Sequence, residues 1–182
     1  MKKTLSIMMA ACFALTVPAL AAIQEGNGEV GFDYGNTDYD NNTGIDSSDS
    51  MSLRGGYFMT RMFEIEGQFV NADDSTNMIG TTVDTNMNLL MVNGVFNFHP
   101  REEIIPYVRV GLGRADLEVS SPIITADDSS MAYQFGGGTR FFFGKEKRAA
   151  FRIDLSWVNE DTFDQSSTHT TFAGGFSWRL GK

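Results

Sequence analysis

The stretch of sequence that decides the fold is residues 131–143, which read MAYQFGGGTRFFF. Tyr133, Phe135 and Phe141 lie on one set of alternate positions, whereas Gln134 and Arg140 lie on the other. This period of two residues indicates a β-strand with one apolar and one polar face, because successive side chains of a strand point to opposite sides. The segment therefore predicts a long strand rather than an amphipathic helix.

The same alternation occurs along most of the chain, whose 182 residues, 42% of them apolar, are enough for one domain. In the segment 86–98 the sequence does not decide which side chains point outward, because Leu90, Val92 and Phe96 lie on one set of alternate positions and Leu89 and Met91 on the other. A second segment, 105–118, is similarly ambiguous. The eight predicted strands lie at residues 30–35, 51–57, 63–69, 86–98, 105–118, 131–143, 151–157 and 172–180.

The connections between these strands alternate in length and charge. Four long, polar connections contain 11 Asp and Glu residues and no Lys or Arg, whereas the three short turns contain five Lys and Arg residues and three Glu residues. A soluble sandwich gives no reason for such a difference, but an outer-membrane barrel has short periplasmic turns and longer external loops. The pattern predicts an all-β fold, a closed eight-stranded antiparallel up-and-down transmembrane β-barrel. The long connections are expected near residues 40–50, 71–84, 119–130 and 159–169, and the short turns near 59–62, 98–104 and 144–149.

The N-terminal residues have the pattern of a secretory signal peptide. Lys2 and Lys3 precede a short apolar run, and Ala19 and Ala21 form a small-residue cleavage site. We expect a signal peptide at residues 1–21 and a single outer-membrane β-barrel domain at residues 22–182. Loss of the two lysines changes the formal net charge from −9 to −11, and the only cysteine of the chain leaves with the signal.

The order of several short motifs resembles the outer-membrane protein β-barrel domain family, which includes the OmpA transmembrane domain, OmpX and OmpW. The resemblance spans the whole of residues 22–182. It implies a location in the outer membrane of a Gram-negative-type bacterium, among outer-membrane lipid and lipopolysaccharide. The motifs are Gly55-Gly56-Tyr57, Ile105-Pro106-Tyr107-Val108 followed by Gly111-Leu112-Gly113, Gly136-Gly137-Gly138, and the final strand from Gly174 to Leu180.

The final strand is similar to the signal that barrel-assembly machinery reads in this class of protein. Gly175, Trp178 and Leu180 have the expected relative spacing, although members of the family commonly end on an aromatic residue where this chain has Leu180. The resemblance therefore implies the barrel-assembly machinery as a partner. We expect the barrel to be a monomer.

The residues that alternate with the apolar set are expected to fill the barrel interior, because an eight-stranded barrel is only wide enough for side chains. Buried charges need partners, and the sequence predicts a salt-bridged polar core. Arg109 is expected to join this core, although the parity of its strand is uncertain. The other predicted members are Asp33, Arg54, Glu64, Glu66, Arg140, Arg152, Asp154 and Arg179.

The sequence predicts no catalytic, cofactor-binding or metal site. After export only His99 and His169 remain as histidines, and the net negative charge argues against nucleic acid as a partner. A structural or surface-interaction role is therefore expected, and the protein is not expected to be an enzyme. Two alternatives remain. One is a narrow porin-like channel, and the other is a soluble periplasmic ligand-binding β-barrel with the aromatic face inside and Arg54 and Arg140 outside.

Overall fold

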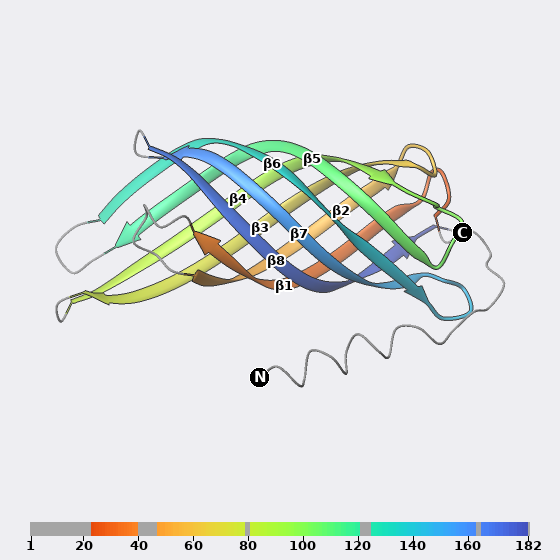
Figure 1. Ribbon diagram of the computed structural model, residues 1–182, viewed down its shortest axis with the longest axis horizontal. Coiled ribbons are helices and arrows are strands. Elements are labelled where there is room, and N and C mark those ends of the chain that lie inside the picture. Colours follow the sequence, from red (N-terminus) through yellow and green to blue (C-terminus); the bar gives the residue numbers. More distant parts are fainter. Residues whose placement is uncertain (1–22, 40–46, 79–80, 121–124, 163–164, 182) are drawn as a thin grey trace.

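The computed structural model describes residues 23–39, 47–78, 81–120, 125–162 and 165–181. Among these residues, no helix has the length and apolarity needed to cross a membrane. The predicted signal peptide with its cleavage residues Ala19 and Ala21 lies outside the described residues. Figure 1 shows the strands β1 Gly28–Tyr39, β2 Ser47–Phe58, β3 Phe63–Met78, β4 Thr81–Asn97, β5 Ile104–Ser120, β6 Thr125–Phe143, β7 Ala149–Thr162 and β8 Gln165–Leu180.

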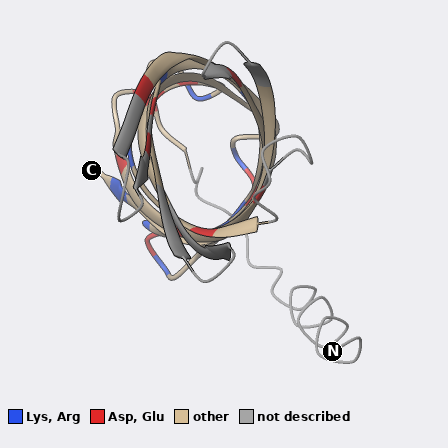
Figure 2. Ribbon diagram, turned by 90° about the vertical axis from the view of Figure 1, so that its left-hand side faces the viewer, with Lys and Arg blue, Asp and Glu red and all other residues tan. Residues whose placement is uncertain are grey.

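The eight strands form a closed barrel, and each pairs antiparallel with its neighbours in the sequence. The first and last strands close the ring, with a register that runs from Gly28↔Leu180 to Tyr39↔His169. Seen from one end, the strands form a continuous wall (Figure 2). The barrel predicted from the sequence is thereby confirmed in strand number, direction and closure.

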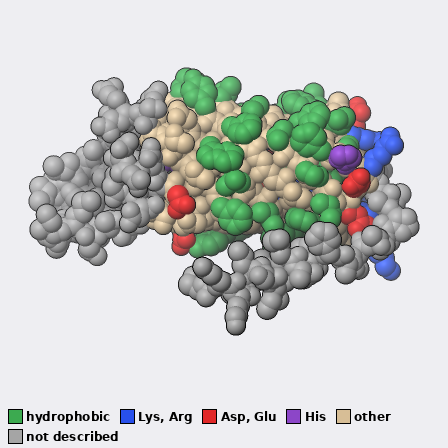
Figure 3. Space-filling model, in the orientation of Figure 1, with side chains coloured by type: hydrophobic (Ala, Val, Ile, Leu, Met, Phe, Trp, Pro, Cys, Tyr) green, Lys and Arg blue, Asp and Glu red, His purple; other side chains and the backbone are tan. Residues whose placement is uncertain are grey.

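The alternation in sequence determines which side chains point out of the barrel. Leu53 in β2 and Phe176 in β8 are 60% and 61% exposed, and apolar side chains are scattered over the outer surface (Figure 3). On β5 the outward apolar positions run from Ile104 to Leu112. Nine residues that rise about 3.3 Å each and tilt by about 40° cover roughly 20–25 Å, which matches the apolar band of an outer-membrane barrel.

The soluble ligand-binding alternative is wrong, because it required the opposite orientation of the two faces. Phe135 and Trp157 lie outside and stack on each other with ring centroids 6.1 Å apart, whereas Arg54 and Arg140 are buried inside. A charged interior and an apolar exterior invert the arrangement of a soluble protein. The outer face is therefore suited to lipid.

The structure also resolves the two strands of ambiguous parity. In β4, Leu90 and Val92 point outward, and Leu89 and Met91 point into the barrel. In β5, Arg109 is buried in the interior, as expected.

The prediction of long loops at one end of the barrel is wrong, because paired strands occupy most of these segments. The ladder of β3 and β4 continues to Met78↔Thr81, that of β5 and β6 to Ser120↔Thr125, and that of β7 and β8 to Thr162↔Gln165. Strand β2 begins at Ser47, and residues 40–46 lie outside the described residues. Polar residues extend these strands because each has an antiparallel neighbour that satisfies its backbone groups, whatever its side chains. The polar hairpins therefore project beyond the apolar band at this end, which we call the hairpin end; the opposite end, with the short turns, is the turn end.

Several glycines on the inner face of the wall make room for large interior side chains. A Cβ atom at Gly138 would overlap the Ile153 carbonyl oxygen and lie 2.6 Å from the Tyr107 hydroxyl oxygen. A Cβ atom at Gly56 would overlap the Glu64 carboxylate. The interior is thus packed so closely that parts of its wall have to lack side chains.

We predict that Gly138→Ala lowers the free energy of unfolding by roughly 1–3 kcal/mol, the usual cost of overpacking. Gly55→Ala is the matched control, because a Cβ atom there meets no heavy atom within 4 Å. Both variants can be unfolded in urea and followed by the change in gel mobility between folded and unfolded barrel. Equal losses in the two variants would contradict close packing at Gly138.

Candidate functional site

The interior of the barrel contains a layer of buried ion pairs that begins with Arg54 of β2. The Nε and Nη2 atoms of Arg54 donate to the two oxygens of Asp33 on β1, each at 2.5 Å. The hydroxyl of Ser52 donates to the same carboxylate at 2.8 Å. Arg54 Nη1 also lies 3.4 Å from Glu66 Oε2. A guanidinium that faces a carboxylate with two parallel hydrogen bonds is among the strongest pairings in proteins.

Arg140 of β6 crosses the barrel to strands at the other side of the ring. Its Nη2 donates to Glu64 Oε2 at 2.6 Å, and its Nε lies 3.3 Å from Glu29 Oε1. Arg140 Nη1 donates to the side-chain oxygen of Asn97. Both Arg140 and Glu64 are completely inaccessible to solvent. This pair therefore links β3 directly to β6 through the lumen.

Arg152 of β7 forms the centre of the network. Its Nη1 donates to Glu66 Oε2 at 2.8 Å and to Glu29 Oε1 at 3.3 Å. Its Nη2 donates to the Tyr107 hydroxyl at 2.8 Å, and that hydroxyl in turn donates to Asp154. The guanidinium carbons of Arg140 and Arg152 lie 4.7 Å and 4.6 Å from the centroid of the Tyr107 ring, so the ring contacts both cations through its π-system.

The remaining predicted members of the charged core lie at its two edges. Arg109 Nη1 is 3.6 Å from Glu66 Oε1 and 3.4 Å from Asp154 Oδ1. Arg179 is buried near the turn end, donates to the Glu146 carbonyl oxygen at 3.2 Å and stands opposite Glu29 in the register of β1 and β8. The structure therefore places all nine predicted core residues inside the barrel.

Three important members of the core were not predicted from the sequence. Glu29, which contacts both Arg140 and Arg152, precedes the segment in which the alternation of β1 was recognised. The two-residue period extended back from Asp33 would have placed Glu29 inside. Tyr107 and Asn97 lie on strands whose parity was open. With Glu29 included, the charged core contains five carboxylates and five arginines, all of them buried.

Two apolar clusters enclose the charged layer along the barrel axis. The cluster near the turn end includes residues from the turn-end halves of β2, β5, β6 and β7, together with Ile23, whose N–H donates to the Pro100 carbonyl at 3.3 Å. The cluster on the other side, toward the hairpin end, is larger. The turn-end cluster is Ile23, Phe58, Ile105, Phe142 and Ala150, and the other is Val70, Ala72, Met87, Leu89, Met91, Ala115, Ala132 and Val158.

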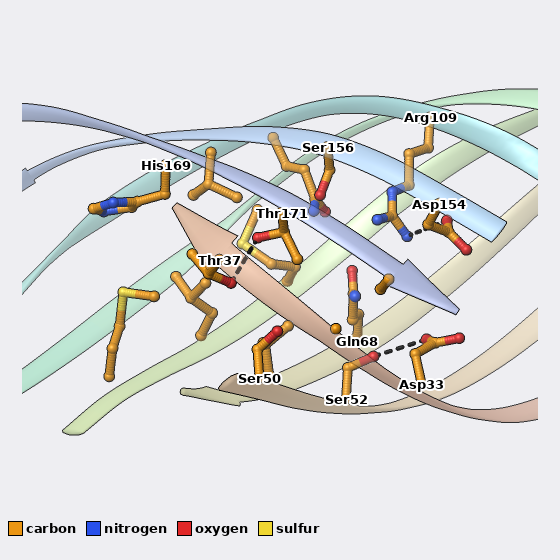
Figure 4. Close-up of a pocket in the computed structure, with 18 residues that line it drawn as sticks. Asp33, Thr37, Ser50, Ser52, Gln68, Arg109, Asp154, Ser156, His169 and Thr171 are labelled. Carbon is orange, nitrogen blue, oxygen red and sulfur yellow. Dashed lines mark hydrogen bonds and ion pairs between the residues drawn. The ribbon is translucent and has the colours of Figure 1, made fainter. Parts of the chain in front are cut away.

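A small cavity remains in the half of the lumen toward the hairpin end. It has a volume of about 20 Å³, which suffices for about one water molecule. Figure 4 shows Arg109 and Asp154 at one part of the cavity and the hydrogen-bonded hydroxyls of Thr37 and Thr171, 2.9 Å apart, at another. His169 lines the cavity too, and its Nε2 lies 2.8 Å from Glu160 Oε1. Within the described residues, no group of His, Cys, Asp or Glu side chains has the arrangement of a metal site.

The three residues of the predicted assembly signal occupy different faces of β8. Trp178 and Leu180 point outward and are about half exposed. Gly175 is buried, and a Cβ atom there would overlap the Asp33 carboxylate and the Phe32 carbonyl oxygen. Gly175 therefore leaves room for the Arg54–Asp33 pair, in addition to any part that it plays in assembly.

Comparison with known proteins identifies the family. A family model described as the outer membrane protein beta-barrel domain matches residues 7–179. The chain belongs to this family, and the resemblance seen in its sequence motifs is confirmed. A search of curated proteins found no match.

Solved structures of the same shape come from several bacteria. Ail, the attachment invasion locus protein of Yersinia pestis, is 18% identical with a TM-score of 0.61 and covers 86% of this chain and 100% of its own. Neisserial surface protein A is 11% identical with a TM-score of 0.72, and the match covers 85% of this chain and 99% of that protein. The N-terminal β-barrel domain of Pseudomonas aeruginosa OprF is 15% identical with a TM-score of 0.58, and the match covers 85% of this chain and 98% of that domain. The protein is thus a bacterial outer-membrane β-barrel.

We predict that Arg54→Gln lowers the free energy of unfolding by about 3–5 kcal/mol, because it leaves Asp33 as an uncompensated buried charge. Arg114→Gln is the control. Arg114 makes a similar ion pair with Asp116 at 2.8 Å, but the two side chains are 66% and 55% exposed, and an exposed pair contributes less than about 1 kcal/mol. Urea unfolding in detergent micelles measures both losses. If the losses are equal, the interior network does not stabilise the barrel.

Proposed function

We propose that this protein is a sealed outer-membrane scaffold that displays polar hairpins at the cell surface. The observation that carries the proposal is the layered lumen, in which buried ion pairs lie between two apolar clusters. An ion that crossed the lumen would have to break charge-assisted hydrogen bonds and then pass the apolar clusters, where the cavity has room for only about one water molecule. Both steps are costly, and the arrangement supports a structural core over a narrow channel.

The projecting hairpins support a surface role. Their strands extend beyond the apolar band only at the hairpin end, and in the family's usual orientation this end faces outside. The described residues there include exposed carboxylates at Asp38, Asp49, Asp116 and Glu118. Acidic side chains at the hairpin end lie at the level of the lipopolysaccharide phosphates. Divalent cations can bridge these carboxylates to the phosphates.

The charge of these hairpins indicates the kind of partner that they exclude. Ail has been solved with the heparin analogue sucrose octasulfate, a polyanion. The acidic hairpins of the present chain repel polyanions, so we infer a surface that contacts lipopolysaccharide through cations or binds a cationic partner. The barrel acts as a monomer and is inserted by the barrel-assembly machinery, which reads Trp178 and Leu180 on the exposed face of β8.

The sealed lumen predicts that the purified barrel passes no measurable ion current in a planar lipid bilayer. A known open porin, inserted under the same conditions, serves as the positive control, and the mobility difference between unboiled and boiled samples verifies that the barrel is folded. Steady ohmic current through the folded protein would contradict the sealed core and favour the narrow channel.

The orientation predicts a difference in labelling between the two ends. In intact cells, a membrane-impermeant maleimide is expected to label Ser129→Cys in the exposed part of β6 but not Lys145→Cys in the β6–β7 turn. Both positions are solvent-exposed in the structure, so both variants label after the outer membrane is permeabilised. Labelling of Lys145→Cys alone in intact cells would reverse the orientation and remove the basis for a surface role.

A further inference from the structure

A groove lies at the turn end of the barrel, between the β2–β3 turn and the β4–β5 turn. It has a volume of about 420 Å³. None of its residues belongs to the charged core of the lumen. We call it the rim groove, and it is lined by Arg61, Met62, His99, Pro100, Arg101 and Glu102.

The backbone of both turns is held in place by hydrogen bonds. The N–H of Asn97, the last residue of β4, donates to the Met62 carbonyl at 2.7 Å, which joins the β2–β3 turn to the start of the β4–β5 turn. The Thr60 hydroxyl accepts from the N–H groups of Met62 and Phe63 at 3.2 Å and 3.0 Å, and the N–H of Glu102 donates to the His99 carbonyl at 3.0 Å. The rim groove is therefore shaped before any ligand arrives, which lowers the entropic cost of binding.

The charges of the rim groove are not balanced. In the neighbouring β6–β7 turn, Lys147 pairs with Glu103, and Arg148 lies 2.9 Å from Glu146. By contrast, no carboxylate of the described residues lies within ion-pair distance of Arg61 or Arg101. Glu102 is the single acidic residue among those that line the groove. Two guanidiniums and one carboxylate leave a net positive charge, which attracts an anion.

The rim groove also meets the lipid-facing band. Met62 is 45% exposed, and Phe98, just before His99, is 38% exposed and packs edge-on against Phe96 with ring centroids 5.1 Å apart. In Figure 3, basic side chains gather at one end of the molecule, directly beside apolar side chains of the outer surface. A ligand that satisfies both parts of the groove has an anionic head and an apolar tail.

We propose that the rim groove binds an anionic glycerophospholipid of the adjacent leaflet. Arg61 and Arg101 hold the phosphodiester, because the planar guanidinium fork matches two phosphate oxygens. Met62 and Phe98 contact the start of the acyl chains. The two arginines and Glu102 together leave one net positive charge, which one phosphodiester neutralises. This balance favours phosphatidylglycerol over phospholipids whose headgroup carries an ammonium group of its own. This binding does not depend on whether the lumen conducts.

Native mass spectrometry of the full barrel released from lipid nanodiscs tests the proposal. Nanodiscs of phosphatidylglycerol and phosphatidylcholine are compared with nanodiscs of phosphatidylethanolamine and phosphatidylcholine. We expect one phosphatidylglycerol to remain bound to the wild type, with weaker retention of phosphatidylethanolamine. Added inorganic phosphate at millimolar concentration is expected not to displace the lipid, and displacement would assign the groove to free phosphate instead.

Two double variants with the same change in net charge separate a site from diffuse attraction. Arg61→Gln/Arg101→Gln is expected to weaken retention by roughly fivefold for each arginine removed. Lys145→Gln/Arg148→Gln removes two cations from the β6–β7 turn and is expected to retain the lipid as the wild type does. Equal weakening in both variants, or equal retention of the two phospholipids by the wild type, would overturn the proposal. The gel-mobility shift on boiling verifies that each variant is folded.

Discussion

The closure of the backbone hydrogen-bond ladder is the constraint on which the rest of the structure depends. Lipid offers no partner to a free N–H or C=O group, so a β-sheet can cross a membrane only if its first and last strands pair. Here β8 pairs with the whole of β1, from Gly28 to Tyr39. Once eight strands close, half of all side chains must enter a narrow lumen, and that lumen has to be filled.

The filling of the lumen is a problem of charge as well as of volume. Arg140 and Arg152 are completely buried, and each contacts carboxylates from more than one strand. Sharing of Glu29 and Glu66 between arginines lets few carboxylates satisfy many donors. The ring of Tyr107 contacts both guanidinium groups through its π-system. Glycines in the wall complete the arrangement, because they admit side chains too large for an ordinary eight-stranded interior.

The sequence was sufficient to predict the faces of the strands but not their ends. Alternation of Phe135 with Gln134, or of Leu53 with Arg54, follows directly from the pleat of a strand, so the outer face and most of the charged core were predicted. The hairpin extensions were not, since Ser, Thr, Asp and Asn have low strand propensity. In β3 and β4 such residues adopt the strand conformation because each one pairs with a residue of the neighbouring strand. The partners of each arginine, such as Glu29 for Arg152, depend on which strands face each other across the lumen, and no local pattern encodes this.

The hairpin extensions at one end have a consequence for how the molecule can enter and leave a membrane. To reach its final position, each hairpin must carry polar strand residues through the hydrocarbon layer, whereas the turns need not cross at all. The described strand residues at the hairpin end include the exposed carboxylates Asp38, Asp49, Asp116 and Glu118, and charges are costly in hydrocarbon. Spontaneous inversion of the finished barrel would require all four hairpins to cross back together. The direction in which the barrel is first threaded is therefore its permanent orientation, set by kinetics rather than by equilibrium.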